Sequence, residues 1–160
     1  MATGALRIAA EEPSPSERPL RLRDDVPLTA RQTRILAALA AYDLTVIRAR
    51  LLKDGVMPAT WVDEAILEFR RYLALRLFSD RRTYVCSKQV DTVWHAAILD
   101  TRLYADFCAR TFGEFIHHHP EEAPIDATTW RDFEVPYSRL FGQPGRIWER
   151  WHPSPAIDQA

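Results

Sequence analysis

Apolar residues between positions 30 and 77 recur with the period of an α-helix, and this spacing constrains the fold more than any other feature of the chain. At the start of the first stretch, Thr29 and Gln32 form a capping-box pattern, and Gly55 follows its last turn. The spacing between them predicts one helical segment. Its inward side would consist of Ile35, Leu36, Leu39, Leu44, Val46, Ile47 and Leu51.

A second helix is predicted to begin at Thr60 as the N-cap, with an inward stripe of Val62, Ile66, Phe69, Leu73 and Leu77. Ser87 is placed as the cap of a third helical segment. Thr129 begins another, which Pro136 should kink or divide. No stretch shows the sustained alternation of a β-sheet. We therefore predict an all-α fold, a compact helical bundle of about five to six helices.

The bulk properties are those of an ordinary globular protein of 160 residues, with 47% hydrophobic residues and a formal net charge of −1. This balance favours neither nucleic acid nor a membrane surface as a partner. Without an export signal, Cys86 and Cys108 are expected to be reduced, buried thiols of a cytoplasmic protein. The expected organisation is a disordered N-terminal segment at 1–26, one helical domain at 27–151 and a C-terminal tail at 152–160.

Residues 88–112 can be read as one helix or as a helical hairpin. In a continuous helix, Gly113 would lie about 27 Å along the axis from His95. The few residues from Gly113 to His118 would be too short to bring His118 back to His95. Asp100 is a good N-cap, and a break there would let the following segment run antiparallel. The sequence "FIHHH" could then cross the N-terminal half of the first helix. We predict the hairpin.

A candidate site follows from the hairpin, because it would bring His118 to Asp91 and His95, which lie one helical turn apart. Two imidazoles and a carboxylate suit a transition metal such as zinc or iron, with His117 or His119 as a possible fourth ligand. Two alternatives stay open. One is a polar network in which Asp91 orients the His95 ring, and the other is metal-free acid–base catalysis.

The string from Val90 to Pro120, V-D-x-x-W-H-x-x-I-L-x-T-x-x-Y-x-x-F-C-x-x-x-F-G-x-F-I-H-H-x-P, resembles the signature of the glycine-rich domain-containing protein-like family. "LFGQPGRIW" at 140–148 resembles that family's closing motif. The resemblance implies a fold shared with bacterial single-domain proteins and with the N-terminal part of plant glycine-rich domain proteins. It implies no reaction. The matching motif residues are Asp91, Trp94, His95, Leu99, Tyr104, Cys108, Gly113 and His118.

Relatives in that family carry a second histidine where this chain has Ala97, so the resemblance also implies that one potential metal ligand is missing here. Two function classes remain. The first is a binding or interaction module in which the Asp/His/His cluster serves architecture and an aromatic C-terminal segment (Phe141, Trp148 and Trp151) docks a partner protein. The second is a small metal-binding protein or metal-dependent enzyme that uses Asp91, His95 and His118.

Overall fold

The computed structural model describes residues 17–80, 83–119 and 126–149, which contain seven α-helices and no β-strand. The all-α prediction is confirmed. The α-helices are α1 (Ala30–Ala41), α2 (Thr45–Asp54), α3 (Val62–Ala74), α4 (Lys88–Leu99), α5 (Thr101–Thr111), α6 (Ala127–Phe141) and α7 (Arg146–Glu149). Three short 3-10 turns accompany them: η1 (Pro19–Arg21), η2 (Ala59–Trp61) and η3 (Leu75–Leu77).

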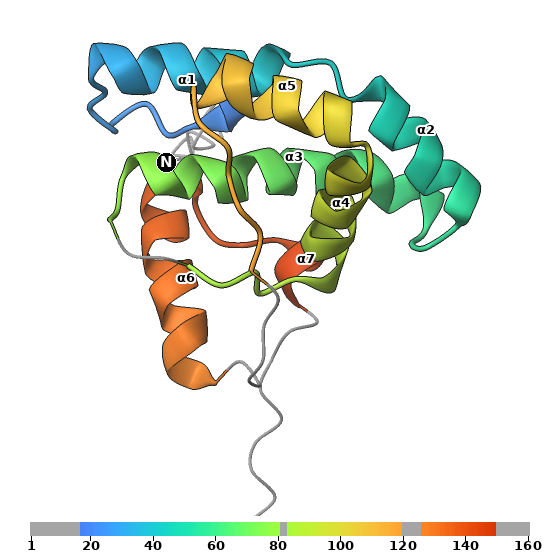
Figure 1. Ribbon diagram of the computed structural model, residues 1–160. Helices are drawn as coiled ribbons and strands as arrows, with labels where there is room; N and C mark the ends of the chain where they lie inside the picture. The colour runs from blue at the N-terminus through green and yellow to red at the C-terminus, as the bar shows by residue number, and fades with distance from the viewer. Residues whose placement is uncertain (1–16, 81–82, 120–125, 150–160) are drawn as a thin grey trace, which may run out of the picture.

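Helix α3 lies at the centre of the fold and packs against α1, α2, α4 and α7. Figure 1 shows α1 and α5 along one side of α3, with α6 on the opposite side. Val62, Phe69 and Leu73 of the predicted stripe are fully buried on α3. A helix with neighbours on several sides must be apolar over a wide arc, and burial of these side chains stabilises the fold by about 1.5–3 kcal/mol each.

The first predicted helix is wrong as one segment, because the structure divides it into α1 and α2. The Thr29–Gln32 capping box and the left-handed Gly55 lie at their predicted positions. Between them, Tyr42 is extended and the Asp43 side chain accepts a hydrogen bond of 2.9 Å from the Thr45 amide. This local cap restarts the chain in a new direction. The division adds a helix to the expected number and leaves Val46 exposed.

Two further helix boundaries differ from their predictions. Thr60 lies inside η2 and makes no capping bond, and α3 begins at Val62. Helix α6 begins two residues earlier than expected, because Asp126 accepts from the Thr129 amide. It also continues through Pro136 without dividing. Buried side chains on both sides of the proline hold this helix together: Phe133, Tyr137 and Leu140.

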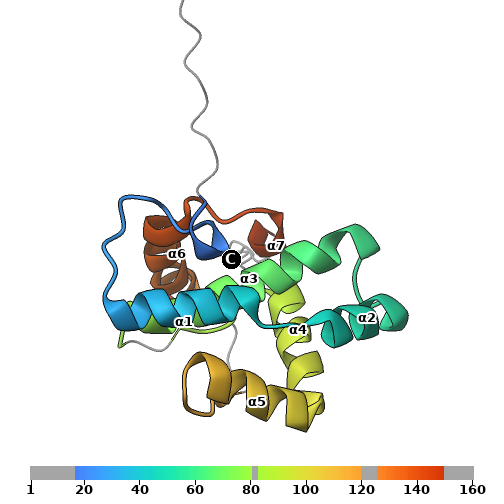
Figure 2. The ribbon, with the colours of Figure 1, turned by 90° about the horizontal axis from the view of Figure 1, so that it is seen from above.

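The predicted break at Asp100 is confirmed: α4 ends at Leu99, and the Asp100 side chain accepts from the Leu103 amide at 3.3 Å to cap α5. The antiparallel geometry is wrong, since α4 and α5 meet at a steep angle in both views (Figures 1 and 2). Helix α5 runs beside α1 instead. There, the rings of Tyr42 and Phe107 meet edge to face at 5.1 Å.

The expected domain boundary at residue 26 is wrong for residues 17–26, which pack into the core. Leu20, Leu22 and Val26 are buried, and Arg71 Nε donates to the Leu20 carbonyl at 2.9 Å. Arg23 also donates its amide to the Leu140 carbonyl, so the segment bridges α3 and α6. Three buried apolar residues in an otherwise charged segment are enough to anchor it. Residues 1–16 and the tail at 152–160 lie outside the described residues.

The described helices can be compared with the requirements of a membrane-spanning helix. Within the described ranges, none combines the length and the apolar character that crossing a bilayer requires.

Candidate metal centre

The N-terminus of α4 holds Asp91 in a fixed place. Ser87 accepts from the Val90 amide at 3.2 Å and donates its hydroxyl to the Ile147 carbonyl at 2.8 Å. The predicted cap is thus confirmed, and it also ties α4 to α7. Asp91 and His95 follow on one face of α4, one turn apart. Both side chains therefore project from a helix whose end cannot fray.

His118 reaches this face because α5 ends in a tight turn. Gly113 has a φ of 75°, a left-handed conformation that few other residues tolerate, and its amide bonds to the Cys108 carbonyl at 3.0 Å. The returning segment is then anchored by Tyr104, whose hydroxyl donates to the Ile116 carbonyl. The same hydroxyl accepts from Trp94 Nε1 at 2.9 Å. A buried chain of hydrogen bonds thus runs from α4 to the segment with His118.

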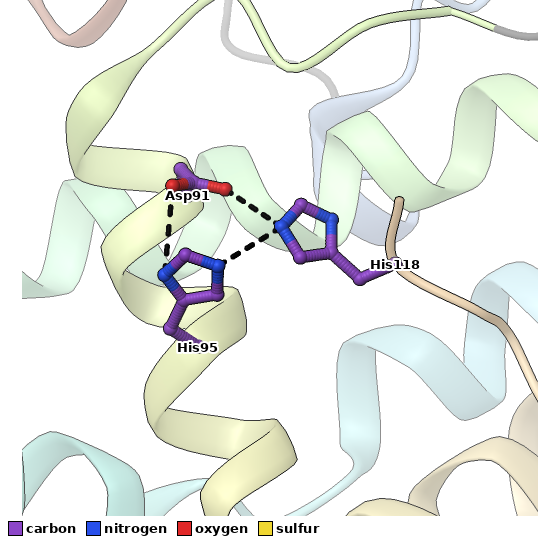
Figure 3. A group of neighbouring side chains, drawn as sticks. All are labelled: Asp91, His95 and His118. Carbon is purple, nitrogen blue, oxygen red and sulfur yellow. Dashed lines mark hydrogen bonds and ion pairs between the residues drawn. The ribbon is translucent and has the colours of Figure 1, made fainter. Parts of the chain in front are cut away.

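Figure 3 shows the three predicted side chains pointing toward one another, two from α4 and one from the returning segment. His118 Nε2 lies 2.9 Å from Asp91 Oδ1 and 3.0 Å from His95 Nε2. His95 Nδ1 lies 3.5 Å from Asp91 Oδ2. One candidate ligand atom from each residue lies within 4.8 Å of the other two. The predicted convergence at this site is present.

The cluster opens to solvent on the α4 side. The His95 side chain is 55% exposed and Asp91 36% exposed, whereas His118 is 9% exposed. The His118 ring packs on Trp94 with 4.3 Å between centroids. Burial lowers the pKa of His118 below its usual 6.5, against the opposing effect of Asp91. The neutral imidazole that burial favours is also the form that binds metals.

The donor set fits a first-row transition metal. Around one zinc ion, with bonds of about 2.0–2.2 Å, tetrahedral ligand atoms lie about 3.3 Å apart. The separations of 2.9 and 3.0 Å around His118 Nε2 are close to that value. Neither His117 nor His119 joins the group of candidate ligands among the described residues. The possible fourth protein ligand is therefore not part of this group.

A family model described as UCP032817-like matches residues 45–130, which is more than half of the chain. The chain belongs to the UCP032817-like family. The match extends from α2 to the start of α6 and includes Asp91, His95 and His118. No curated protein and no solved structure matches the chain.

The remaining predicted motif residues of this UCP032817-like domain have mixed outcomes. Cys108 is buried and unpaired in the core, as predicted. Leu99 is 73% exposed and therefore does not pack in the core. Trp148 is fully buried against α6, which removes it from any docking surface. Trp151 lies outside the described residues.

Sequence reasoning missed Glu68 and Arg76 in the UCP032817-like domain. Glu68 is buried on α3 and accepts from Tyr137 and Trp148. It lies outside the predicted apolar stripe of α3, beside the additional buried residues Ala65 and Tyr72, so the stripe gave no signal for it. Arg76 lines a groove next to His118. Nothing in the local sequence connects η3 to residues 117–119, so only the folded chain reveals that neighbour.

Proposed function

We propose that this domain binds one divalent transition metal ion, zinc or iron, through Asp91, His95 and His118. The observation that supports it is the convergence of the three ligand atoms at a face open to solvent. Two imidazole nitrogens and one carboxylate oxygen are preferred ligands of these metals. The open face supplies an entry path, which any metal site requires.

A purely architectural network explains the cluster less well. With its proton on Nε2, His118 has one N–H between two acceptors, Asp91 Oδ1 and His95 Nε2. One N–H cannot form a full hydrogen bond to both acceptors, so one of them is left without a complete hydrogen bond. Hydrogen bonds and ion pairs of half-exposed groups such as His95 contribute only about 0–1 kcal/mol, because water competes for them. The small stability that these contacts supply therefore does not account for the convergence of the three side chains.

The site's activity would follow from its open coordination. Three protein ligands leave at least one position of a metal for water, where bound zinc would lower the pKa of that water and make hydroxide available near neutral pH. The chain's own residues hold the site: Tyr104 fixes the His118 segment and the Ser87 cap fixes α4. Hydrolysis, or binding of a small ligand at the metal, is the chemistry that this arrangement supports.

The test is zinc binding to the full chain, purified without an affinity tag and stripped of metal by a chelator. Calorimetry should give one zinc per chain. His118→Ala, His95→Ala and Asp91→Ala should each weaken binding by more than the roughly 10–100-fold that loss of an outer-shell partner costs. His119→Ala is the matched control, since His119 neighbours His118 but lies outside the ligand group.

Equal affinities of the His118 and His119 variants, or no stoichiometric binding of either zinc or ferrous iron, would overturn the proposal. The cluster would then be the polar network of a binding module. Elemental analysis of protein from cells distinguishes zinc from iron.

We also propose that the chain is related to the glycine-rich domain-containing protein-like family. Support comes from its motif residues, several of which have parts in one site. Trp94 and Tyr104 link α4 to the returning segment, Gly113 ends α5, and His118 joins the cluster. A solved structure of a plant relative should therefore show a helix break at the position equivalent to Asp100.

A further inference from the structure

A polar groove borders the His118 segment and is not lined by Asp91 or His95. Its main cavity, about 430 Å³, lies between η3 and residues 112–119. This volume is within the range of small-molecule sites. Beside it lies a hollow of about 20 Å³ between residues 83–85 and 117–119, which shares Arg76 and His117 with the main cavity and reaches Trp94 and His118. We call this hollow the inner end of the groove. The groove therefore meets the candidate metal centre at one residue, His118.

The inner end of the groove is rich in hydrogen-bond donors. Its lining includes Arg76 and three consecutive histidines, 117–119, and none of the described residues that line it is an aspartate or a glutamate. The acidic residues of the main cavity, Asp80 and Glu114, do not line this inner end. Asp91 contacts His118 Nε2 at 2.9 Å but does not line this end of the groove. A cation and imidazoles that no described carboxylate of the lining neutralises favour a ligand with a negatively charged oxygen.

Within the described parts of the chain, no residue competes with a ligand for Arg76. Some other arginines of the fold are paired with carboxylates, for example Arg48 with Asp63 and Arg110 with Asp106. Arg76 is exposed and forms no ion pair or hydrogen bond with any residue in the described parts of the chain. Its guanidinium can therefore offer its donors without first breaking an internal contact.

His118 supplies a second donor at the same place. Its Nε2 faces Asp91 and His95, and its Nδ1 lies on the opposite side of the ring (Figure 3). None of the residues that the structure describes hydrogen-bonds to this Nδ1. A histidine that binds metal through one nitrogen keeps its proton on the other and donates it to an oxygen acceptor. His118 lines the inner end of the groove, so an acceptor bound there would lie beside its ring.

We propose that the groove binds the oxyanion group of a small molecule, a carboxylate or a phosphate, between the Arg76 guanidinium and His118 Nδ1–H. Through His118 this binding is coupled to metal binding, and that coupling rests on the proposed function above. An anion that accepts from Nδ1–H makes the imidazole a better metal ligand, and by reciprocity the metal strengthens anion binding.

The test is calorimetric titration of inorganic phosphate, and separately of succinate, into the full chain with and without one equivalent of zinc. One of the two anions should bind, which also identifies the source of the oxyanion. Arg76→Gln should weaken binding about tenfold or more, the effect of losing a charge-assisted hydrogen bond. Arg34→Gln, at an exposed arginine of α1 outside the groove, should leave it unchanged. Zinc should tighten binding about fivefold or more in the wild type, because the coupling runs through His118.

Three outcomes would overturn the inference. In the first, neither anion binds; in the second, Arg76→Gln and Arg34→Gln behave alike. In the third, zinc binds but leaves the anion affinity of the wild type unchanged, which means that His118 does not couple the two sites. Failure of both zinc and ferrous iron to bind would instead refute the proposed function. Anion binding that depends on Arg76 in the metal-free protein would still support the groove.

Discussion

The hydroxyl of Tyr104 connects the core to the candidate site. It accepts from Trp94 Nε1 at 2.9 Å and donates to the Ile116 carbonyl, two residues before His118. Burial raises the pKa of Tyr104 far above its ordinary value, so the hydroxyl keeps its proton. A single oxygen therefore satisfies one buried donor and one buried acceptor, and fixes the segment that presents His118.

Tyr104→Phe should destabilise the fold by about 1–3 kcal/mol, because it leaves the Trp94 N–H and the Ile116 carbonyl without their partner. It should also weaken zinc binding, since the His118 segment loses its anchor. Urea denaturation and zinc titration measure the two effects. Tyr84→Phe, at a half-exposed tyrosine, is the control. A Tyr104 variant as stable as this control would contradict the anchoring role.

At the scale of elements, the path from α5 to the site depends on one backbone conformation. Gly113 has a φ of 75°, and a Cβ added there would meet no atom within 4 Å. The cost of a side chain at this position is therefore conformational and involves no steric clash with neighbours.

Gly113→Ala should lower the free energy of unfolding by about 1–2 kcal/mol, the cost of the left-handed conformation for an L-residue. Gly145→Ala is a matched control, because it also has open space around a Cβ but no positive φ. Thermal denaturation of both variants measures the difference. Equal melting temperatures would mean that the turn after α5 does not require glycine.

The contact between α1 and α5 should weaken at alkaline pH. Tyr42 donates to Asp106 Oδ2 at 2.8 Å. Burial, and then this hydrogen bond, raises the pKa of Tyr42 to about 12. Because the folded pKa is above the unfolded value near 10, the contribution of Tyr42 is complete below pH 10 and is lost as pH rises through 12.

The stability difference between the wild type and Tyr42→Phe should therefore shrink between pH 10 and 12. Denaturant titrations at several pH values measure it. Asp106→Asn should move the ionisation of Tyr42 toward lower pH, because it removes the carboxylate that opposes the tyrosinate. An unchanged ionisation in Asp106→Asn, followed by ultraviolet absorbance, would show that the two side chains do not interact in solution.

At the scale of the whole molecule, Glu68 and its partner Arg71 join residues 17–26, α6 and α7 to the central helix α3. Its carboxylate pairs with Arg71 at 2.9 Å and accepts from the Tyr137 hydroxyl at 2.6 Å and from Trp148 Nε1 at 2.8 Å. Arg71 in turn donates to the Leu20 carbonyl and lies over the Phe141 ring. One buried ion pair on α3 thus holds the N-terminal segment, α6 and α7.

Glu68→Ala should destabilise the protein by about 3–5 kcal/mol, since it leaves a buried guanidinium and two buried donors without their acceptor. Glu64→Ala is the matched control, one turn earlier on α3, where Glu64 forms an exposed pair with Arg146. Its effect should be small, because solvent screens that pair. Similar losses of stability in the two variants would contradict a central role for Glu68.

The sequence by itself determined the features that depend on near neighbours. Helical periodicity, the Thr29–Gln32 capping box, the Ser87 and Asp100 caps and the left-handed Gly55 are all present. Each arises from residues within four positions of one another, so a local pattern is sufficient to specify it. The candidate site followed from the same signals, because the break at Asp100 makes the return of His118 possible.

The tertiary structure decided how these elements meet. Helix α5 turns steeply away from α4 because α1 offers it an apolar face, and no local signal encodes that neighbour. Packing likewise keeps α6 continuous through Pro136 and draws residues 17–26 into the core. The opening of the Asp91–His95–His118 cluster to solvent and its proximity to Arg76 depend on segments far apart in the chain. Contacts of that kind are selected by the burial of the whole core, which no single stretch of sequence specifies.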